Sequence, residues 1–156
     1  MTSNRVCVWI LTAAYLALLF SSISVAQDLE LILGDRSVAV SSAVRDGTTY
    51  YRFRDFVPAF QLSFREAGDQ LIISGPRGEI RLVAGRPLAR IGEEYLLLSE
   101  PVLRDSRGEW YVPIDFIPKV LQSLTESRIV RTGRTTYRVD LQNTVPVEME
   151  VHPYPN

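Results

Sequence analysis

Short apolar runs alternate with turn residues along most of this chain, at the close spacing that is typical of a sheet-rich protein. The first half contains runs at 29–33, 36–41, 48–51, 70–74 and 79–83. The second half contains runs at 88–91, 95–98, 109–112, 128–131 and 135–141. Because glycine, aspartate and proline stand between these runs, we expect most connections to be antiparallel hairpins.

Helical spacing occurs in two places, where apolar residues stand four apart. The two stripes are Phe56, Phe60 and Phe64, and then Phe116, Val120 and Leu124. A stripe of this period usually packs on a core. We therefore expect an α+β fold, with a twisted antiparallel β-sheet packed on two short helices. Pro118 lies inside the second stripe, so we expect that helix to begin with a tight 3₁₀ turn or to start late.

Both stripes belong to a phrase that the chain contains twice, with an offset of sixty residues. The shared positions are Tyr51, Asp55, Phe56 and Pro58 in the first copy, and Tyr111, Asp115, Phe116 and Pro118 in the second. Repetition at a fixed offset indicates a duplicated structural unit. We expect one domain over 27–141, built from two diverged repeats at about 29–83 and 84–141.

The N-terminal segment has a different pattern from the rest of the chain. An apolar run at 6–20 follows Arg5 and precedes the small residues Ser24-Val25-Ala26, which predicts a signal peptide over 1–26. The run is shorter than the roughly 20 residues that a membrane-spanning helix needs. We expect cleavage after Ala26 and export to the periplasm or the exterior of the cell envelope, with Cys7 removed. At the other end, 142–156 has the composition of a linker and C-terminal tail, with one further strand at 147–151.

Charge and residue content exclude several functions. The formal net charge is −1, which does not favour nucleic acid as a partner. The mature chain would keep His152 as its single histidine, too few imidazoles or thiolates for a copper or zinc site or for a serine triad. Asp55 and Asp115 could act as an acid–base pair, but helix capping is the stronger interpretation of a carboxylate at a helix start. We expect no cofactor, no metal and no enzymatic activity.

Two surfaces are candidates for binding. Tyr50-Tyr51 and Trp110-Tyr111 precede the two predicted helices, and successive strand residues point to opposite faces. We expect Tyr51 and Tyr111 to face inward as the repeated residues, leaving Tyr50 and Trp110 outward. An exposed tryptophan would suit a sugar or protein contact, with edge-strand packing as the alternative.

The second candidate surface is basic. Four arginines cluster on the last predicted hairpin, at Arg128, Arg131, Arg134 and Arg138. They could bind phosphate or carboxylate groups of an envelope polymer. The alternative is an ordinary solvated face that protects an edge strand from pairing.

The segment from Trp110 to Leu121, WYVPIDFIPKVL, with the predicted hairpin after it, resembles the YVPLRFIAEALG phrase of copper amine oxidase N-terminal-like domains, also called stalk domains. The resemblance is best over 104–141 and looser over 29–83. The chain departs from the family at Phe53, where the family has proline, at Pro118, where a helix former is usual, and at Gln122, where a glycine commonly closes the helix. The resemblance implies an exported, noncatalytic α+β module that is often found beside N-acetylmuramoyl-L-alanine amidases. The copper in the family name belongs to a separate catalytic domain.

Three functions are compatible with these features. The first is an exported, noncatalytic cell-envelope interaction module that assists attachment to peptidoglycan or another wall component. The second is the N-terminal portion of an N-acetylmuramoyl-L-alanine amidase without its catalytic domain. The third is a protein-docking or assembly domain that adds a partner strand to an exposed edge. The expected partner is a cell-wall glycan or an envelope protein, with membrane contact only through the signal segment; the oligomeric state stays open.

Overall fold

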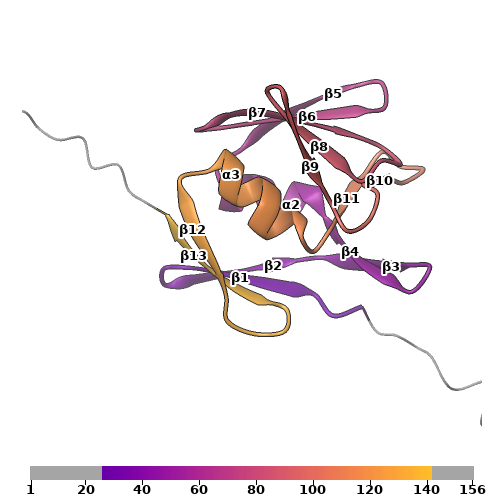
Figure 1. Ribbon diagram of the computed structural model, residues 1–156. Helices are drawn as coiled ribbons and strands as arrows, with labels where there is room; N and C mark the ends of the chain where they lie inside the picture. Colours follow the sequence, from indigo (N-terminus) through magenta and orange to yellow (C-terminus); the bar gives the residue numbers. More distant parts are fainter. Residues whose placement is uncertain (1–25, 142–156) are drawn as a thin grey trace, which may run out of the picture.

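A computed structural model describes residues 26–141 of the chain (Figure 1). The predicted signal peptide up to residue 25, Cys7, the predicted strand at 147–151 and His152 lie outside the described residues. Within them, the predicted α+β class is confirmed: the domain consists mostly of strands, with two short helical regions.

The first part of the domain contains seven strands and one helix: β1 (Leu29–Leu33), β2 (Arg36–Val40), β3 (Ser42–Arg45), β4 (Thr48–Arg52), α2 (Phe53–Ala59), β5 (Ser63–Ala67), β6 (Gln70–Gly75) and β7 (Gly78–Val83). The second part contains β8 (Leu88–Ile91), β9 (Glu94–Leu97), β10 (Leu103–Arg104), β11 (Trp110–Pro113), the π-helix η1 (Ile117–Leu121), α3 (Gln122–Leu124), β12 (Ser127–Arg131) and β13 (Thr136–Leu141). Within the described residues all ten predicted strands are present, and each end lies within one residue of the prediction, whereas β3, β5 and β10 were not predicted.

The strands form three sheets. The terminal sheet has the order β12-β13-β1-β2, the central sheet β10-β11-β4-β3, and the five-stranded sheet β5-β6-β7-β8-β9. Figure 1 shows the two helical regions between the five-stranded sheet and the terminal sheet. Every pairing is antiparallel except that of β1 with β13, which run parallel. These two strands come from opposite ends of the domain, so no hairpin joins them and their direction is not fixed by a turn.

The core is centred on aromatic side chains of the two helical regions. Phe53, Phe56 and Phe116 are each at most 1% exposed. The ring of Phe116 lies 6.2 Å from that of Phe53, edge to face, and 6.0 Å from that of Phe56. Burying one such side chain stabilises a fold by roughly 1.5–3 kcal/mol. The two helical regions therefore meet through these rings, and the sheets close over them.

The first helix is shorter than its apolar stripe predicts. It ends at Ala59, Gln61 adopts a left-handed φ of 52°, and the Leu62 N–H donates to the Val57 carbonyl at 3.0 Å. This bond is the closing bond of a Schellman motif, and the left-handed residue prevents the helix from continuing. Phe64 is therefore on β5 and not on the helix, so its predicted helical position was wrong.

The second helical region has a predicted 3₁₀-type bond at its start, but its body is wider than an α-helix. One 3₁₀-type bond, from the Ile117 N–H to the Ile114 carbonyl at 3.3 Å, precedes it. The body is a π-helix over Ile117–Leu121, in which the Gln122 N–H donates to the Ile117 carbonyl. Pro118 supplies no N–H to this turn, which removes one bond that would hold an α-helical pitch. Gln122 has a right-handed φ of −64°, so the helix continues through it into α3.

Candidate functional site

Trp110 lies in the core and not on the surface, with 3% of its area exposed. In the central sheet Val112 pairs with Tyr51, and Tyr111 pairs with Arg52. Directly opposed residues share a face of the sheet, and a shift of one residue moves a side chain to the other face. Trp110 therefore shares the core face with Val112 and Tyr51. The expectation that Trp110 faces outward and Tyr111 inward was wrong, because Tyr51 pairs with Val112 and not with Tyr111, which puts the two repeated tyrosines on opposite faces of the sheet.

The surroundings of Trp110 are those of a covered core residue. The Arg104 guanidinium carbon lies 5.6 Å from the centre of its ring. Arg104 is held there by an ion pair with Glu66 at 2.5 Å and by donation to the Gly68 carbonyl at 3.2 Å. The Nε1 atom of Trp110 is buried, and no residue within 26–141 forms a hydrogen bond with it. We expected the ring of Trp110 to contact a ligand, but Arg104 of the protein itself covers this ring.

Tyr50 lies on the face of the sheet opposite to Tyr51, as expected, but it is only 5% exposed, so its expected exposure was wrong. It still lines an open groove of about 420 Å³ on the outward face of the central sheet, together with the half-buried Tyr111. We call this the central groove; its polar lining residues are Arg45, Asp46, Arg104, Asp105 and Ser106. Burial, and then the nearby carboxylates of Glu100 and Asp46, raise the pKa of Tyr50 above its ordinary value. Its hydroxyl is therefore a neutral hydrogen-bonding group at neutral pH.

The polar lining residues of the central groove differ in what they already bind. Asp105 accepts the backbone N–H groups of Arg107 and Glu109 at 2.9 Å each, so it organises the β10–β11 turn. Arg45 and Asp46 are exposed, and no hydrogen bond or ion pair among the described residues occupies their side chains. A guanidinium and a carboxylate next to two tyrosines give the groove donors, acceptors and an aromatic surface.

Asp55 does not cap its helix. The N-cap of α2 is Arg52, whose side chain makes no capping bond, and Asp55 lies in the first turn. Its Oδ2 accepts the Ser41 backbone N–H at 2.8 Å, and its Oδ1 accepts Arg52 Nη2 at 2.6 Å. Burial acts to raise the pKa of Asp55, but the hydrogen bonds from Arg52 and Ser41 outweigh it, and the pKa is lowered. The carboxylate is thus committed to structure.

Asp115 makes the corresponding contacts before the second helical region. It accepts the Ser99 backbone N–H at 2.7 Å and the Ser99 hydroxyl at 2.8 Å, and it pairs with Lys119 at 2.9 Å. Each aspartate therefore links the start of a helical region to a serine that lies between two strands, Asp55 to Ser41 and Asp115 to Ser99. The capping interpretation was wrong, because within residues 26–141 neither carboxylate accepts an N–H group of its own helix. Each accepts the N–H group of a serine that precedes the helix in the sequence.

The arginines of the final hairpin do not form one cluster. Arg128 and Arg138 are exposed on β12 and β13, and Arg128 lies directly opposite Asp140. Arg131 instead donates from Nε to the Gly133 carbonyl at 2.9 Å and from Nη2 to the Arg134 carbonyl at 2.6 Å. It thereby holds its own turn. The expected basic surface is therefore divided. Arg128 and Arg138 lie on a strand face that also carries Asp140, whereas Arg131 belongs to the turn.

Sequence reasoning missed a row of arginines on the outer face of the five-stranded sheet. Successive cross-strand pairs place Arg65 beside Ile72, Ile72 beside Arg81, Arg81 beside Arg90, and Arg90 beside Tyr95. We call Arg65, Arg81 and Arg90 the arginine row. In the sequence these residues lie in separate runs, and only the register of four strand pairs brings them together. The alternation of charged and apolar residues at 79–83 was the one available signal.

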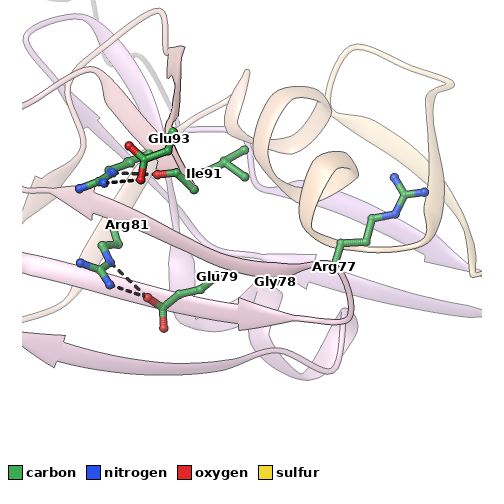
Figure 2. A pocket seen from close by; sticks show the side chains of 8 residues that line it. Arg77, Gly78, Glu79, Arg81, Ile91 and Glu93 are labelled. Carbon is green, nitrogen blue, oxygen red and sulfur yellow. Dashed lines mark hydrogen bonds and ion pairs between the residues drawn. The ribbon is translucent and has the colours of Figure 1, made fainter.

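An open groove of about 500 Å³ adjoins the arginine row, lined by residues of β7, β8 and their turns. Two ion pairs lie there, Arg81 with Glu79 at 3.1 Å and Arg90 with Glu93 at 3.4 Å. Figure 2 shows the pair of Arg81 with Glu79. The side chain of Arg77 extends away from both pairs (Figure 2). The ion pairs are exposed, and pairs of this kind contribute little to stability. The arginines can therefore exchange these partners for an external anion at small cost.

No group of three or more histidine, cysteine, aspartate or glutamate side chains within residues 26–141 is arranged to hold a metal ion. Over the same residues, no helix combines the length and the apolar character needed to cross a membrane. Comparison of the chain with family models, with curated proteins and with solved structures finds no match.

Proposed function

We propose that this protein is an exported, noncatalytic interaction module of the cell envelope that binds peptidoglycan or another wall polymer in the central groove. The observation that supports this proposal is the combination of Tyr50, Tyr111, Arg45 and Asp46 along one groove. Sugar rings present apolar faces and hydroxyl groups together, so an aromatic surface beside planar polar side chains suits them. The groove volume of about 420 Å³ is in the range of small-ligand sites.

Binding fits the site better than catalysis does. Asp55 and Asp115, the repeated carboxylates, each accept a serine N–H and pair with a cation. A general base must be within hydrogen-bond reach of a substrate proton, and these oxygens already have partners within the protein. Asp46 is the carboxylate of the groove without such partners, and one carboxylate does not form an acid–base pair.

We infer further that the domain consists of two diverged units, at about 29–83 and 84–141. In each part a hairpin is followed by a second hairpin, a helical region and a third hairpin. The contact of Asp55 with Ser41 and that of Asp115 with Ser99 occur at the same place in this order. The third hairpin of each part joins the sheet of the other part's first hairpin: β12-β13 pairs with β1-β2, and β5-β6 is joined to β8-β9 through β7.

Cosedimentation with isolated sacculi tests the binding proposal, using the chain from Gln27 to Asn156. The double variant Arg45→Gln/Asp46→Asn removes both charges, and asparagine tolerates the left-handed φ of 50° at position 46. We expect it to bind at least about fivefold more weakly, because charge-assisted hydrogen bonds to the polymer are lost. Arg128→Gln, which removes an exposed arginine of the terminal sheet, is the matched control. Equal loss in the control, or no loss in the double variant, would contradict the groove as the site.

The two alternatives give different outcomes in the same experiment. A docking or assembly domain would leave the sacculi unbound, and crosslinking in envelope extracts would then recover a protein partner. The N-terminal portion of an amidase would bind sacculi without degrading them, since its catalytic domain would lie elsewhere in the polypeptide. A separately purified amidase domain could then be added to the sacculi. Faster hydrolysis in the presence of the wild-type protein, but not of the Arg45→Gln/Asp46→Asn variant, would favour the amidase alternative.

A further inference from the structure

Large apolar side chains are exposed together on the β8–β9 hairpin. Leu88, Tyr95 and Leu97 are 36%, 63% and 64% exposed, and Leu88 pairs directly with Leu97. Because alternate residues of a strand share a face, all three lie on the outer face of the five-stranded sheet. Exposed apolar groups that gather in this way mark an interaction surface more often than scattered ones do.

The arginine row continues into this apolar patch. Arg90 pairs with Tyr95 on one side and with Arg81 on the other, and Arg86 lines the same hollow as Leu88 and Tyr95. Two like charges directly opposite each other on a sheet are unfavourable unless an anion lies nearby. Glu79 and Glu93 supply part of the negative charge that Arg81 and Arg90 need. The Glu93 side chain is 95% exposed, so its ion pair with Arg90 is weak. The surface thus joins exposed leucines to arginines with weakly held partners.

We propose that this face docks on the surface of a membrane that contains anionic phospholipid. Leu88, Tyr95 and Leu97 enter the interface between headgroups and acyl chains, and the arginines beside them bind lipid phosphates. Apolar burial and attraction to anionic headgroups act together in such binding, and guanidinium groups bind phosphate through paired N–H donors.

The exposed leucines decide the class of partner. A hydroxyl-rich glycan or a soluble polyphosphate would satisfy the arginines, but it offers no apolar phase to a Leu97 side chain that is 64% exposed. The patch lies on a different sheet from the central groove. This inference therefore does not depend on the proposed binding of wall polymer, and the two sites can be tested separately.

The experiment is cosedimentation of the chain from Gln27 to Asn156 with vesicles of phosphatidylcholine, with and without phosphatidylglycerol. We expect binding to the anionic vesicles that is at least about tenfold stronger than to phosphatidylcholine alone, and that weakens with added salt. Leu97→Ser and the double variant Arg81→Gln/Arg90→Gln should each abolish most of this binding. Val130→Ser, an apolar position 39% exposed on the terminal sheet, should bind as wild type does.

Three results would overturn the proposal. The first is absence of binding to anionic vesicles, and the second is equal binding to both vesicle types. The third is capture on immobilised polyphosphate as strong as that on vesicles and unaffected by Leu97→Ser, which would show a surface for soluble polyanions. Circular dichroism and urea unfolding of each variant exclude a folding defect as the cause of lost binding. The Arg45→Gln/Asp46→Asn variant should retain vesicle binding, which separates this surface from the central groove.

Discussion

Ser41 donates its backbone N–H to the Asp55 carboxylate across fourteen residues, with 2.8 Å between nitrogen and oxygen. Ser41 lies between β2 and β3, where the chain passes from the terminal sheet to the central sheet. A partly buried N–H group needs an acceptor, and the first turn of α2 supplies one. Asp55 therefore joins two sheets and a helix, and this position explains the aspartate better than a catalytic role does.

Replacement of Asp55 by asparagine should destabilise the fold. The amide keeps one oxygen for the Ser41 N–H but loses the charge that pairs with Arg52. We expect the free energy of unfolding at pH 7 to fall by about 1–3 kcal/mol, as measured by urea denaturation. Glu93→Gln removes a carboxylate that is 95% exposed and should leave stability close to that of the wild type. Equal losses in the two variants would contradict the structural role of Asp55.

The Asp55→Asn variant should also change the response to acid. The pKa of Asp55 in the folded protein is below the ordinary value of 3.8, because hydrogen bonds from Arg52 and Ser41 outweigh burial. Its contribution to stability is therefore complete above the unfolded-state pKa and is lost as the pH falls through the folded-state pKa. The stability difference between wild type and variant should shrink below about pH 4 in urea titrations. A difference that stays constant down to pH 2 would rule out this linkage.

Gly75 is required by the close approach of β6 to the end of α3. A Cβ at this position would lie 2.8 Å from Leu124 Cγ and 2.9 Å from the Leu124 carbonyl oxygen. We expect Gly75→Ala to lower the free energy of unfolding by about 1–3 kcal/mol through overpacking. In a Leu124→Ala background the cost should be smaller by about 0.5 kcal/mol or more, because the contact with Leu124 Cγ is removed. The contacts with the Leu124 carbonyl oxygen and with Leu62 Cδ2, at 3.2 Å, remain. Strict additivity in this double-mutant cycle would show that the contact is not the cause.

Gln61 and Gln122 give opposite expectations for the same substitution. Gln61 has a φ of 52°, so Gln61→Gly should raise the free energy of unfolding by about 0.5–1 kcal/mol. Gln122 has a φ of −64° inside a continuous helix, so Gln122→Gly should lower it by about 1 kcal/mol. Thermal and urea denaturation of both variants tests the pair. Destabilisation by Gln61→Gly would mean that its side chain matters more than its backbone conformation.

Trp110 should behave as a core residue when it is replaced. Because it is 3% exposed, Trp110→Ala should cost about 3–5 kcal/mol of stability through a cavity. Trp110→Phe should cost clearly less than Trp110→Ala, since it keeps an aromatic ring and removes the buried, unpartnered Nε1 group. Urea denaturation followed by far-UV circular dichroism measures both. Near-wild-type stability of Trp110→Ala, combined with weaker binding to sacculi, would restore Trp110 as a ligand contact.

The spacing of apolar and turn residues was sufficient to predict most helices and strands, but it did not predict where the first helix ends. The hairpin turn at Asp46-Gly47 has two positive φ angles, as that residue pair predicts. The stripe of Phe56, Phe60 and Phe64 predicted one continuous helix, yet Phe64 packs edge to face on Phe53 from β5, at 5.4 Å. Both arrangements bury the same rings, so apolar spacing alone does not distinguish them. The reversal at Gln61 decides between them, and glutamine carries no strong signal for it.

The sequence by itself determined the α+β class, the positions of the hairpins and the burial of Phe56 and Phe116, because these follow from residue spacing and turn chemistry within short windows. The tertiary structure decided which face each strand residue takes and which distant side chains meet. It placed Trp110 under Arg104, and it assembled Arg65, Arg81, Arg90 and Tyr95 into one row. Faces and rows depend on strand register, and a shift of a single residue reverses every side chain while leaving the local pattern unchanged.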